Sequence, residues 1–453
     1  MKSSIDRFVS THMLLPIASC LAVVASHGLA VARAPLASVH STDAVAPAAA
    51  GERGGPPLVL LAGKVLLAEY GGRATIDGAA LVIADGQIAA IELARDFVVP
   101  DGSKVIDLGD RWVMPGMIDL HSHVAAPLSD LSDSVYLANP GMRIGPAIQV
   151  ANTKLENGVA GGVTAVLAIP GSATNMGGGG VLMRLGLDDY EESLLRDPGS
   201  LKLAQSGNPE RWSPHFPRRS FMNWNTRSVF RRGIAYAKKW EAFEKSLGER
   251  PERDLQLDIF RALYKKETQV STHTQMFQVV EMTITMVREN FGLDVYIDHG
   301  TFDGYRAAEH AQRAGVPAII GPRMISPSFP GFIDQDGRVE GVAAMYQKAG
   351  HKTVGFNTDT IGRGGMQQEE LALQAAMACR YGFDDVEMDG VRGLTIVPAI
   401  ASGLDGKLGS IEIGKDADLV VTTGNPMDPR VSIELVLVDG RLVYDPTKEF
   451  RRF

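Results

Sequence analysis

The feature that most restricts the fold of this chain is a series of short apolar or β-branched runs, each ending in a side chain that can bind a metal ion. The first run, residues 113–120, is followed by His121-Ser122-His123. On a strand, residues two apart point the same way, so both imidazoles can reach one metal ion. A single His-x-His is weak support, because two histidines can also lie together in an ordinary loop. The pair therefore needs support from other parts of the chain.

Three later positions repeat this arrangement of a run and a ligand. They are His273 after residues 268–272, His299 after residues 293–298 and Asp359 after residues 353–358. Helical patterns follow these runs, at Phe277–Asn290, Tyr305–Ala314 and Gln367–Arg380. A strand followed by a helix, repeated along the chain, is typical of a (β/α)8 barrel of the TIM type, whose functional residues lie at the C-terminal ends of the strands. The sequence therefore predicts an α/β fold with one metal site at the mouth of such a barrel.

Four segments carry a resemblance to a known family. They are Pro115–His123, Gly161–Thr164 with Pro170–Ala173, Leu201–Ala204 with Asn208-Pro209, and Gly409–Val420. With these segments the chain resembles the metal-dependent amidohydrolase superfamily, in its secreted imidazolonepropionase-like and Xaa-Pro dipeptidase-like branch. The resemblance implies that the residues that bind the metal, or work beside it, are His121, His123, His273, His299 and Asp359. It also implies a composite β-sandwich next to the barrel.

The expected ligands predict a hydrolytic site. Neutral imidazoles and a carboxylate around Zn²⁺ leave a position for water, whose pKa then falls from about 15.7 to about 7. Asp359 can take the proton from the attacking water and deliver it to the leaving nitrogen, which makes it the predicted catalytic acid and base. The alternative for Asp359 is a helix N-cap, although residues 362–365 separate it from the helix that is expected to begin at Gln367.

Lys202 is the candidate for a ligand that bridges two metal ions. It lies at the expected fourth barrel strand, where related enzymes often use a lysine carboxylated on its amine. The unmodified ammonium cannot serve, because a cation does not coordinate a cation. Relatives continue with Gly-Glu-Asn-Pro where this chain has Ser206-Gly207-Asn208-Pro209, so Gly207 stands in place of a glutamate. One metal or a weakened pair is therefore an alternative, and an ordinary ion pair is the alternative for Lys202.

Two further segments are candidates for the substrate pocket. A basic cluster runs from Arg211 to Arg232, and its members Arg211, Arg218 and Arg219 are predicted to hold a substrate carboxylate bidentately. The alternative is a solvated helix face that pairs with Glu241 and Glu244. The run Gly177–Gly180 would let the backbone approach a ligand closely, or would form a flexible turn.

Composition excludes some classes of function. Hydrophobic content of 45% and charged content of 22% are ordinary for a soluble globular protein. The formal net charge of −8 argues against a nucleic-acid partner, which usually requires a basic face. We therefore expect a small-molecule amide or dipeptide as the substrate, and we leave open a homo-oligomer.

Residues 1–34 are predicted to be a cleaved export signal. Lys2 and Arg7 precede an apolar stretch, and Ala30-Val31-Ala32 offers a cleavage site. Interruptions such as Pro16 make the stretch a poor membrane span. The alternative is a lipoprotein anchor at Cys20. The mature protein is accordingly expected in the periplasm or outside the cell.

Strand-rich patterns at both ends of the chain predict a second domain. They lie at Leu58–Leu67, Ala79–Ile91, Ala417–Thr422 and Ile433–Val443, with turns at Asp85-Gly86 and Asp439-Gly440. The predicted division is a linker at 35–57, a β-sandwich part at 58–112, the barrel at 113–400 and the second β-sandwich part at 401–453. The β-sandwich is expected to brace the barrel without chemistry of its own.

The sequence thus predicts an exported hydrolase that uses water activated by one or two divalent metal ions, with Zn²⁺ expected, to cleave a C–N bond in an amide, cyclic imide or dipeptide. Two alternatives of the same chemistry are an Xaa-Pro dipeptidase and an N-acyl amino acid deacylase. The alternative of another class is a catalytically silent barrel that only binds metal.

Overall fold

The computed structural model describes residues 51, 53–322, 324–326, 340–362 and 366–448. The chain divides into a unit of residues 1–46 and a unit of residues 47–453, and all described helices and strands belong to the second. The predicted export signal at 1–34, with Cys20 and its cleavage site, lies outside the described residues, as does most of the predicted linker. Among the described residues, no helix combines the length and the apolarity that crossing a bilayer requires.

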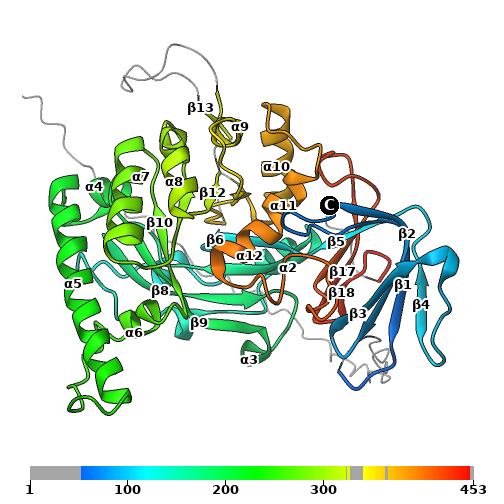
Figure 1. Cartoon of the computed structure of the whole chain (residues 1–453), viewed down its shortest axis with the longest axis horizontal. Helices are drawn as coiled ribbons and strands as arrows, with labels where there is room; N and C mark the ends of the chain where they lie inside the picture. The colour runs from blue at the N-terminus through cyan, green and yellow to red at the C-terminus, as the bar shows by residue number, and fades with distance from the viewer. Residues whose placement is uncertain (1–50, 52, 323, 327–339, 363–365, 449–453) are drawn as a thin grey trace, which may run out of the picture. The chain divides into compact units, whose positions relative to one another are not determined.

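Eight strands form the sheet of a nearly closed barrel (Figure 1), in the order β15-β12-β11-β10-β9-β8-β7-β6. Their bounds are β6 Met117–Ser122, β7 Val163–Ala168, β8 Met176–Arg184, β9 Leu194–Ala204, β10 Gln269–His273, β11 Val295–His299, β12 Ala318–Ile320 and β15 Val354–Phe356. The first and last strands meet just beyond β15, where Ser122 pairs in parallel with Thr360 and the backbone N–H of His123 donates to the carbonyl of Thr360 at 3.0 Å. The predicted α/β barrel is confirmed in this coarse form.

The regular strand-helix alternation fails at β8. This strand runs antiparallel to both β7 and β9, and the only helix between β8 and β9 is the single turn α3, Tyr190–Ser193. The glycines of Gly177–Gly180 lie buried inside β8, neither in a turn nor in a loop. A Cβ at Gly180 would meet the carbonyl oxygen of Ala168 at 2.6 Å, and one at Gly178 would meet that of Met142 at 2.8 Å. Close packing of backbone segments on β8 therefore explains the run.

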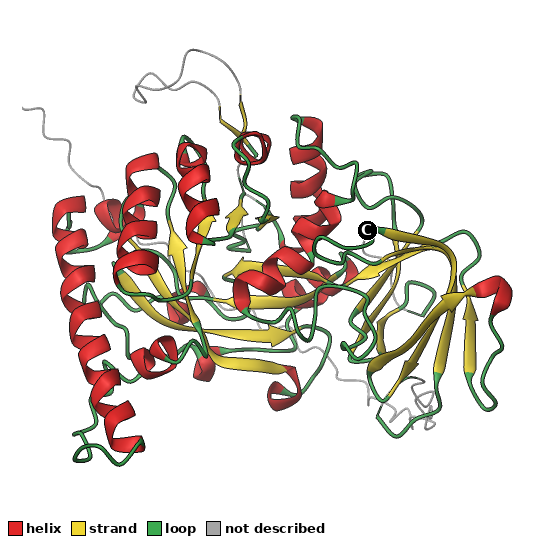
Figure 2. Cartoon of the chain, in the orientation of Figure 1, coloured by secondary structure: helices red, strands yellow, loops and turns green. Residues whose placement is uncertain are grey.

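Helices cover the outside of the barrel sheet (Figure 2). Their bounds are α1 Leu128–Leu131, α2 Thr153–Ala160, α4 Asn208–Trp212, α5 Arg219–Glu244, α6 Ile259–Tyr264, α7 Phe277–Thr283, α8 Ala308–Ala314, α9 Val342–Lys348, α10 Leu371–Arg380, α11 Asp389–Leu394 and α12 Ile396–Ser402. A π-helical segment, Ile284–Asn290, extends α7, so the helix predicted at Phe277–Asn290 is present over its whole length. The rings of Phe230 and Phe260, with centroids 5.2 Å apart, pack α5 against α6.

One continuous sheet unites the two ends of the described chain. Its order is β18-β17-β16-β5-β1-β2-β3, with β4 paired to β1. The bounds are β1 Leu58–Leu66, β2 Thr75–Ala84, β3 Gln87–Leu93, β4 Lys104–Asp107, β5 Trp112–Pro115, β16 Leu419–Thr422, β17 Ile433–Val438 and β18 Arg441–Tyr444. Antiparallel pairing of β5 with β16 joins the N-terminal and C-terminal strands. A shared β-domain built from both ends is thus present, while the predicted boundaries at 112/113 and 400/401 fall inside β5 and α12.

A buried ion cluster lies between this sheet and the barrel. Arg184, the last residue of β8, contacts Asp416 through Nη2 and Asp418 through Nε at 3.2 Å. Its Nη1 lies 3.8 Å from Asp439 in the turn between β17 and β18. The guanidinium fork matches several carboxylates at once, so one side chain ties three points of the β-domain to the barrel.

Candidate metal centre

The structure brings the four predicted histidines together at the C-terminal ends of the barrel strands. His121 and His123 lie at the end of β6, His273 ends β10 and His299 ends β11, and all four are buried. The Nε2 atoms of His121 and His123 are 3.2 Å apart, and Nδ1 of His273 is 2.7 Å from Nε2 of His299. The rings of His121 and His299 have centroids 4.5 Å apart, which joins the two pairs into one cluster.

Hydrogen bonds on the far side of the rings set their orientation. Nδ1 of His123 donates to the carbonyl of Ile169, and Nδ1 of His299 donates to the carbonyl of Gly321, each at 2.8 Å. Because one ring nitrogen carries the proton for that bond, Nε2 keeps its lone pair and points into the cluster. Nδ1 of His121 contacts Oδ2 of Asp298 at 2.6 Å. Metal-binding imidazoles are usually held in this way.

Asp359 and Lys202 complete the cluster. Oδ1 of Asp359 lies 3.1 Å from Nε2 of His121 and 3.5 Å from Nε2 of His123. Nζ of Lys202, which is fully buried, lies 3.3 Å from Nε2 of His121. Within the described chain Lys202 forms no direct ion pair with a carboxylate, contrary to the ordinary ion pair considered as its alternative. Two overlapping groups place their ligand atoms within 4.8 Å of one another, namely His121 with His123 and Asp359, and His121 with Asp298 and His299.

Two members of the cluster have a strained backbone. His299 has φ of +73° and Asp359 has φ of +48°, in the left-handed region that side chains other than glycine rarely adopt. Each such residue costs on the order of 1–3 kcal/mol and persists only where its surroundings enforce it. On a regular strand, Asp298 and His299 would point to opposite sides. The turn of the backbone at His299 is consistent with both side chains reaching the same cluster.

The electrostatics of the cluster leave most imidazoles neutral. Burial lowers the pKa of His123 and His273, and it lowers the pKa of His299 to about 4. Burial also opposes the charged form of His121, but Asp298 and Asp359 outweigh it and raise the pKa of His121 to about 9. Neutral imidazoles with free lone pairs are the form that binds a metal.

The acidic and basic members respond differently to burial. Burial raises the pKa of Asp359, but the neighbouring histidines, His121 first, outweigh it and hold that pKa well below its usual range. Burial lowers the pKa of Lys202. The cluster therefore combines an anionic carboxylate with a lysine whose charged form is disfavoured.

Sequence reasoning missed a set of polar residues behind the cluster. Asp119 accepts hydrogen bonds from the backbone N–H of His121 at 3.0 Å, from Oγ1 of Thr358 at 2.5 Å and from Nε2 of Gln368 at 2.7 Å. Burial raises the pKa of Asp119 to about 6. These bonds tie the end of β6 to the segment after β15. Asp119 and Asp298 could have been found as acids inside apolar runs, whereas no local signal singles out Gln368.

The predicted substrate arginines are all exposed and lie on or next to α4 and α5. Nη2 of Arg219 is 3.1 Å from Sδ of Met276, and its Nε is 3.7 Å from Oε1 of Glu210. Oε2 of Glu210 accepts from the backbone N–H of Gly207 at 2.8 Å, and a Cβ on Gly207 would lie 4.0 Å from Nε2 of His273. Arg219 is thus connected to the edge of the cluster. Among the described residues, Arg211 and Arg218 make no such contact, and the substrate-binding roles stay predictions.

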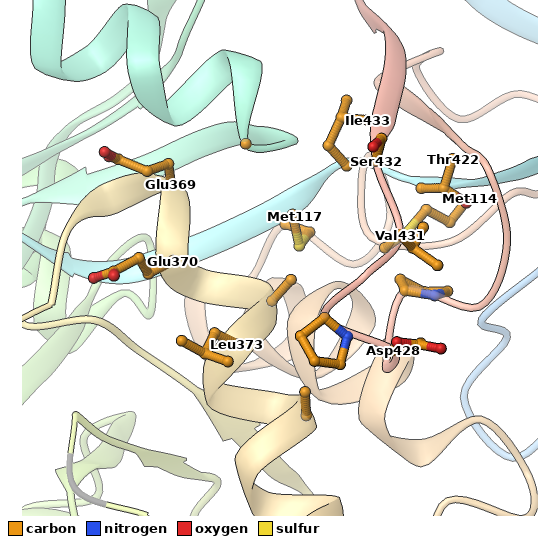
Figure 3. Close-up of a pocket in the computed structure, with 15 residues that line it drawn as sticks. Met114, Met117, Glu369, Glu370, Leu373, Thr422, Asp428, Val431, Ser432 and Ile433 are labelled. Carbon is orange, nitrogen blue, oxygen red and sulfur yellow. The ribbon is translucent and has the colours of Figure 1, made fainter. Parts of the chain in front are cut away.

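A separate cavity of about 340 Å³ lies where β5, β6 and α10 meet the loop before β17 (Figure 3). Met117, Leu373 and Val431 surround it, while the carboxylates of Glu369 and Glu370 point away from it. Its lining contains no histidine. The cavity adjoins the first residue of β6, whereas the candidate metal centre lies at the other end of that strand.

Comparison with known proteins identifies relatives that match much of the chain. A model described as the amidohydrolase family matches residues 271–443, which include His273, His299 and Asp359. Amidohydrolase tasK of Hapsidospora irregularis is 24% identical over an alignment of 399 residues, and the match covers 77% of this chain and 38% of that protein. The chain therefore spans about two fifths of the length of this curated relative.

Solved structures show the same fold. The crystal structure of an amidohydrolase from Thermotoga maritima MSB8 has a TM-score of 0.74 and 26% identity, and the match covers 86% of this chain and all of that one. An Xaa-Pro dipeptidase with methionine bound in its active site has a TM-score of 0.53 at 17% identity, over 86% of this chain and all of that one, which shows the fold alone. The chain thus combines a barrel and a cluster of histidines with an aspartate with a likeness to the amidohydrolase family over residues 271–443 and to a solved amidohydrolase over 86% of its length.

Proposed function

We propose that this protein is a metal-dependent hydrolase that cleaves the C–N bond of an amide, a cyclic imide or a dipeptide. The observation that carries the proposal is the convergence of His121, His123, His273, His299 and Asp359 at the C-terminal ends of the barrel strands. In barrels of this type the functional residues lie at that end. The likeness to the amidohydrolase family over residues 271–443 supports the same reaction class.

The donor atoms fit a divalent cation such as Zn²⁺. Nitrogen and carboxylate oxygen are the ligands that Zn²⁺ prefers, and a catalytic site keeps a position open for water. Nε2 of His121, Nε2 of His123 and Oδ1 of Asp359 converge, so a proton or a metal ion must lie among them to offset their mutual repulsion. We assign one ion to these three residues. His273 and His299, with Lys202, would hold a second.

When bound, such an ion polarises the scissile carbonyl and makes hydroxide available near neutral pH. Asp359 does the proton work: its carboxylate, ionised because of its lowered pKa, accepts the proton of the attacking water and passes it to the leaving nitrogen. Asp298 and the carbonyls of Ile169 and Gly321 hold the imidazoles in position. Burial excludes bulk water from the imidazoles, whereas the side chain of Asp359 is 29% exposed.

Lys202 is proposed to bridge the two ions after carboxylation of its amine. Its lack of a paired carboxylate among the described residues and its closeness to His121 support this role. A neutral amine is the form that reacts with CO₂, and burial favours it. If the proposal holds, reloading of apoprotein with metal in CO₂-free buffer gives about half the metal content reached with added bicarbonate. Lys202→Met takes up the same lower amount with or without bicarbonate.

The second candidate function is hydrolysis of Xaa-Pro dipeptides or N-acyl amino acids. Arg219, linked through Glu210 to the loop beside His273, favours a substrate with a free carboxylate. We also propose that the protein is exported to the periplasm or beyond, on the strength of the apolar N-terminal stretch and its cleavage site. Mass measurement of exported protein should then find a new N-terminus between Ala30 and Ser38.

One experiment tests the central proposal. Purified protein is stripped with a chelator, reloaded with Zn²⁺, Mn²⁺ or Co²⁺, and assayed for amine release or ring opening on N-acyl amino acids, cyclic imides and Xaa-Pro dipeptides. Turnover should be lost with the metal and regained on reloading. Glu309→Gln, an exposed change on α8, serves as the matched control for Asp359→Asn. Full metal content without turnover on any of these substrates would leave the silent metal-binding barrel as the better description.

A further inference from the structure

The segment from Arg211 to Lys239, which spans α4 and most of α5, differs in charge from the rest of the chain. It contains eight basic residues and no acidic one, although the chain as a whole carries a formal net charge of −8. The basic residues are Arg211, Arg218, Arg219, Arg227, Arg231, Arg232, Lys238 and Lys239. A basic segment in an acidic protein suggests an anionic partner.

The same segment exposes large aromatic side chains. Trp212, Phe216, Phe221 and Trp224 are 70%, 64%, 47% and 60% exposed, and they are all of the exposed Phe and Trp residues in the described chain. The rings of Phe221 and Trp224 lie against each other, with centroids 5.5 Å apart. Isolated exposed apolar residues are common, but a gathering of the largest ones marks an interaction surface.

Helical spacing puts charge and aromatic rings on one face of α5. Phe221, Trp224, Arg227 and Arg231 follow one another at intervals of three or four residues, so they share a face. The opposite face, with Val229 and Phe230, is buried in the barrel's core. Figure 1 shows α5 at the outer edge of the barrel, on the side away from the sheet of the two chain ends.

The arginines of this face are not neutralised within the described structure. Glu241 pairs with Lys245, and Glu244 pairs with Arg261 and Lys265, so these acids do not pair with the α5 arginines as the alternative interpretation expected. Arg227 makes a side-chain contact with Asn223 at 3.3 Å, and neither Arg231 nor Arg232 has an ion pair with a described carboxylate. Their charges are available to a partner.

We propose that this face of α4 and α5 docks on an anionic phospholipid surface. Guanidinium groups bind phosphate oxygens bidentately, and Trp and Phe rings insert at the level of the headgroups, as in helices that lie in the plane of a membrane. An exposed face of a long helix presents these groups along a line, which suits a flat partner. A second copy fits less well, because a twofold contact would bring the two basic faces together.

The test is sedimentation of the full chain with vesicles of phosphatidylcholine alone or of equal phosphatidylcholine and phosphatidylglycerol. At low salt, binding to the anionic vesicles should be at least tenfold tighter, and 0.5 M NaCl should remove most of the difference. Arg227→Glu/Arg231→Glu should lose at least tenfold in this affinity. The control Arg313→Glu/Lys352→Glu makes the same change in charge on other exposed positions and should stay within twofold of the unmodified chain.

A second variant separates insertion from charge. Trp212→Ser/Trp224→Ser should lose the blue shift of tryptophan fluorescence that anionic vesicles cause in the unmodified chain. Circular dichroism and metal content check that each variant is folded. Equal binding to both vesicle types, or unchanged binding of the Arg227→Glu/Arg231→Glu chain, overturns the proposal. So does binding of single-stranded RNA without vesicle binding, or self-association that these substitutions abolish.

Discussion

The candidate metal centre and the Arg184 cluster are both buried groups of charged side chains, yet they differ in how positive and negative charges are paired within them. Arg184 lies among Asp416, Asp418 and Asp439, donates hydrogen bonds to the first two and forms an ion pair with the third at 3.8 Å. In the metal centre, Nε2 of His121 and of His123 and the carboxylate of Asp359 face one another, and only His121 has a raised pKa, whereas burial disfavours the charged forms of His123 and Lys202. The first cluster pairs its charges within the chain, whereas the second gathers ligand atoms that could hold a metal ion.

This difference separates a structural role from a chemical one. A buried charge that is already paired within the chain needs no added ion, because its hydrogen bonds are made in the folded protein. A group of converging acceptors is unfavourable by itself and becomes favourable with a metal ion. Substitutions in the Arg184 cluster should therefore lower the stability of the protein. Substitutions in the metal centre should lower its metal content and turnover.

The largest effect is expected from His121→Ala/His123→Ala. Tight Zn²⁺ binding and turnover should both be abolished, while the protein stays folded because apolar burial supplies most of its stability. Metal content by elemental analysis and circular dichroism measure the two properties. Arg184→Met, tested in parallel, should keep its metal. An unchanged metal-to-protein ratio in the folded double variant would remove the assignment of this pair.

Asp359→Asn should keep most of the metal, because the histidines remain, but lose about 10² to 10⁴ in kcat, the usual contribution of a positioned acid or base. The unmodified enzyme should lose kcat/KM as the pH falls through the pKa of Asp359, which lies well below its ordinary value. In the asparagine variant this acid limb should vanish or move. Near-normal turnover with full metal would show that another residue transfers the proton.

Arg184→Met should destabilise the protein by about 3–5 kcal/mol, because Asp418 loses its one ion-pair partner among the described residues, while Asp416 and Asp439 keep only Lys407 and Arg53. Burial already raises the pKa of Asp418 even with Arg184 present, and its removal should raise that pKa further. A raised carboxyl pKa means that stability is lost as the pH rises through it and is regained below it. Urea unfolding should therefore show a larger deficit at pH 7.5 than at pH 5. An equal deficit at both would point to lost packing alone.

The smallest effect is expected from Gln368→Leu, which deprives Asp119 of one donor and Ser122 of its acceptor. A buried group left without a partner costs about 1–3 kcal/mol, so the unfolding free energy should fall by that amount while metal content is kept. Gln278→Leu, an exposed change on α7, should have almost no effect. Loss of metal in the Gln368 variant would instead make this residue part of the metal centre.

The sequence by itself was sufficient to predict the recurrent strands and the helices after β10, β11 and β15. It also predicted the histidines at the ends of three strands. These features depend on near neighbours: apolar runs favour strands, and ligands at their ends lie at one mouth of a parallel barrel. A β-domain shared by the two ends also follows from the matching strand-rich patterns, but the pairing of β5 with β16 does not, because residues 113–120 were predicted as a single barrel strand. The roles of the individual site residues, the metal and the export signal stay predictions until they are measured.

The remaining features of the fold and of the site became visible only in the tertiary structure. The glycines of β8 suggested a turn or a ligand contact, but packing from both sides makes them an antiparallel strand. Asp298 reaches His121 across 177 positions of sequence, and Gln368 reaches Asp119 across 249. Such contacts depend on closure of the barrel and on the left-handed backbone at His299, and no local propensity encodes either. Periodicity is a property of adjacent residues, whereas the balance of charges in a cluster is set by side chains that only folding brings together.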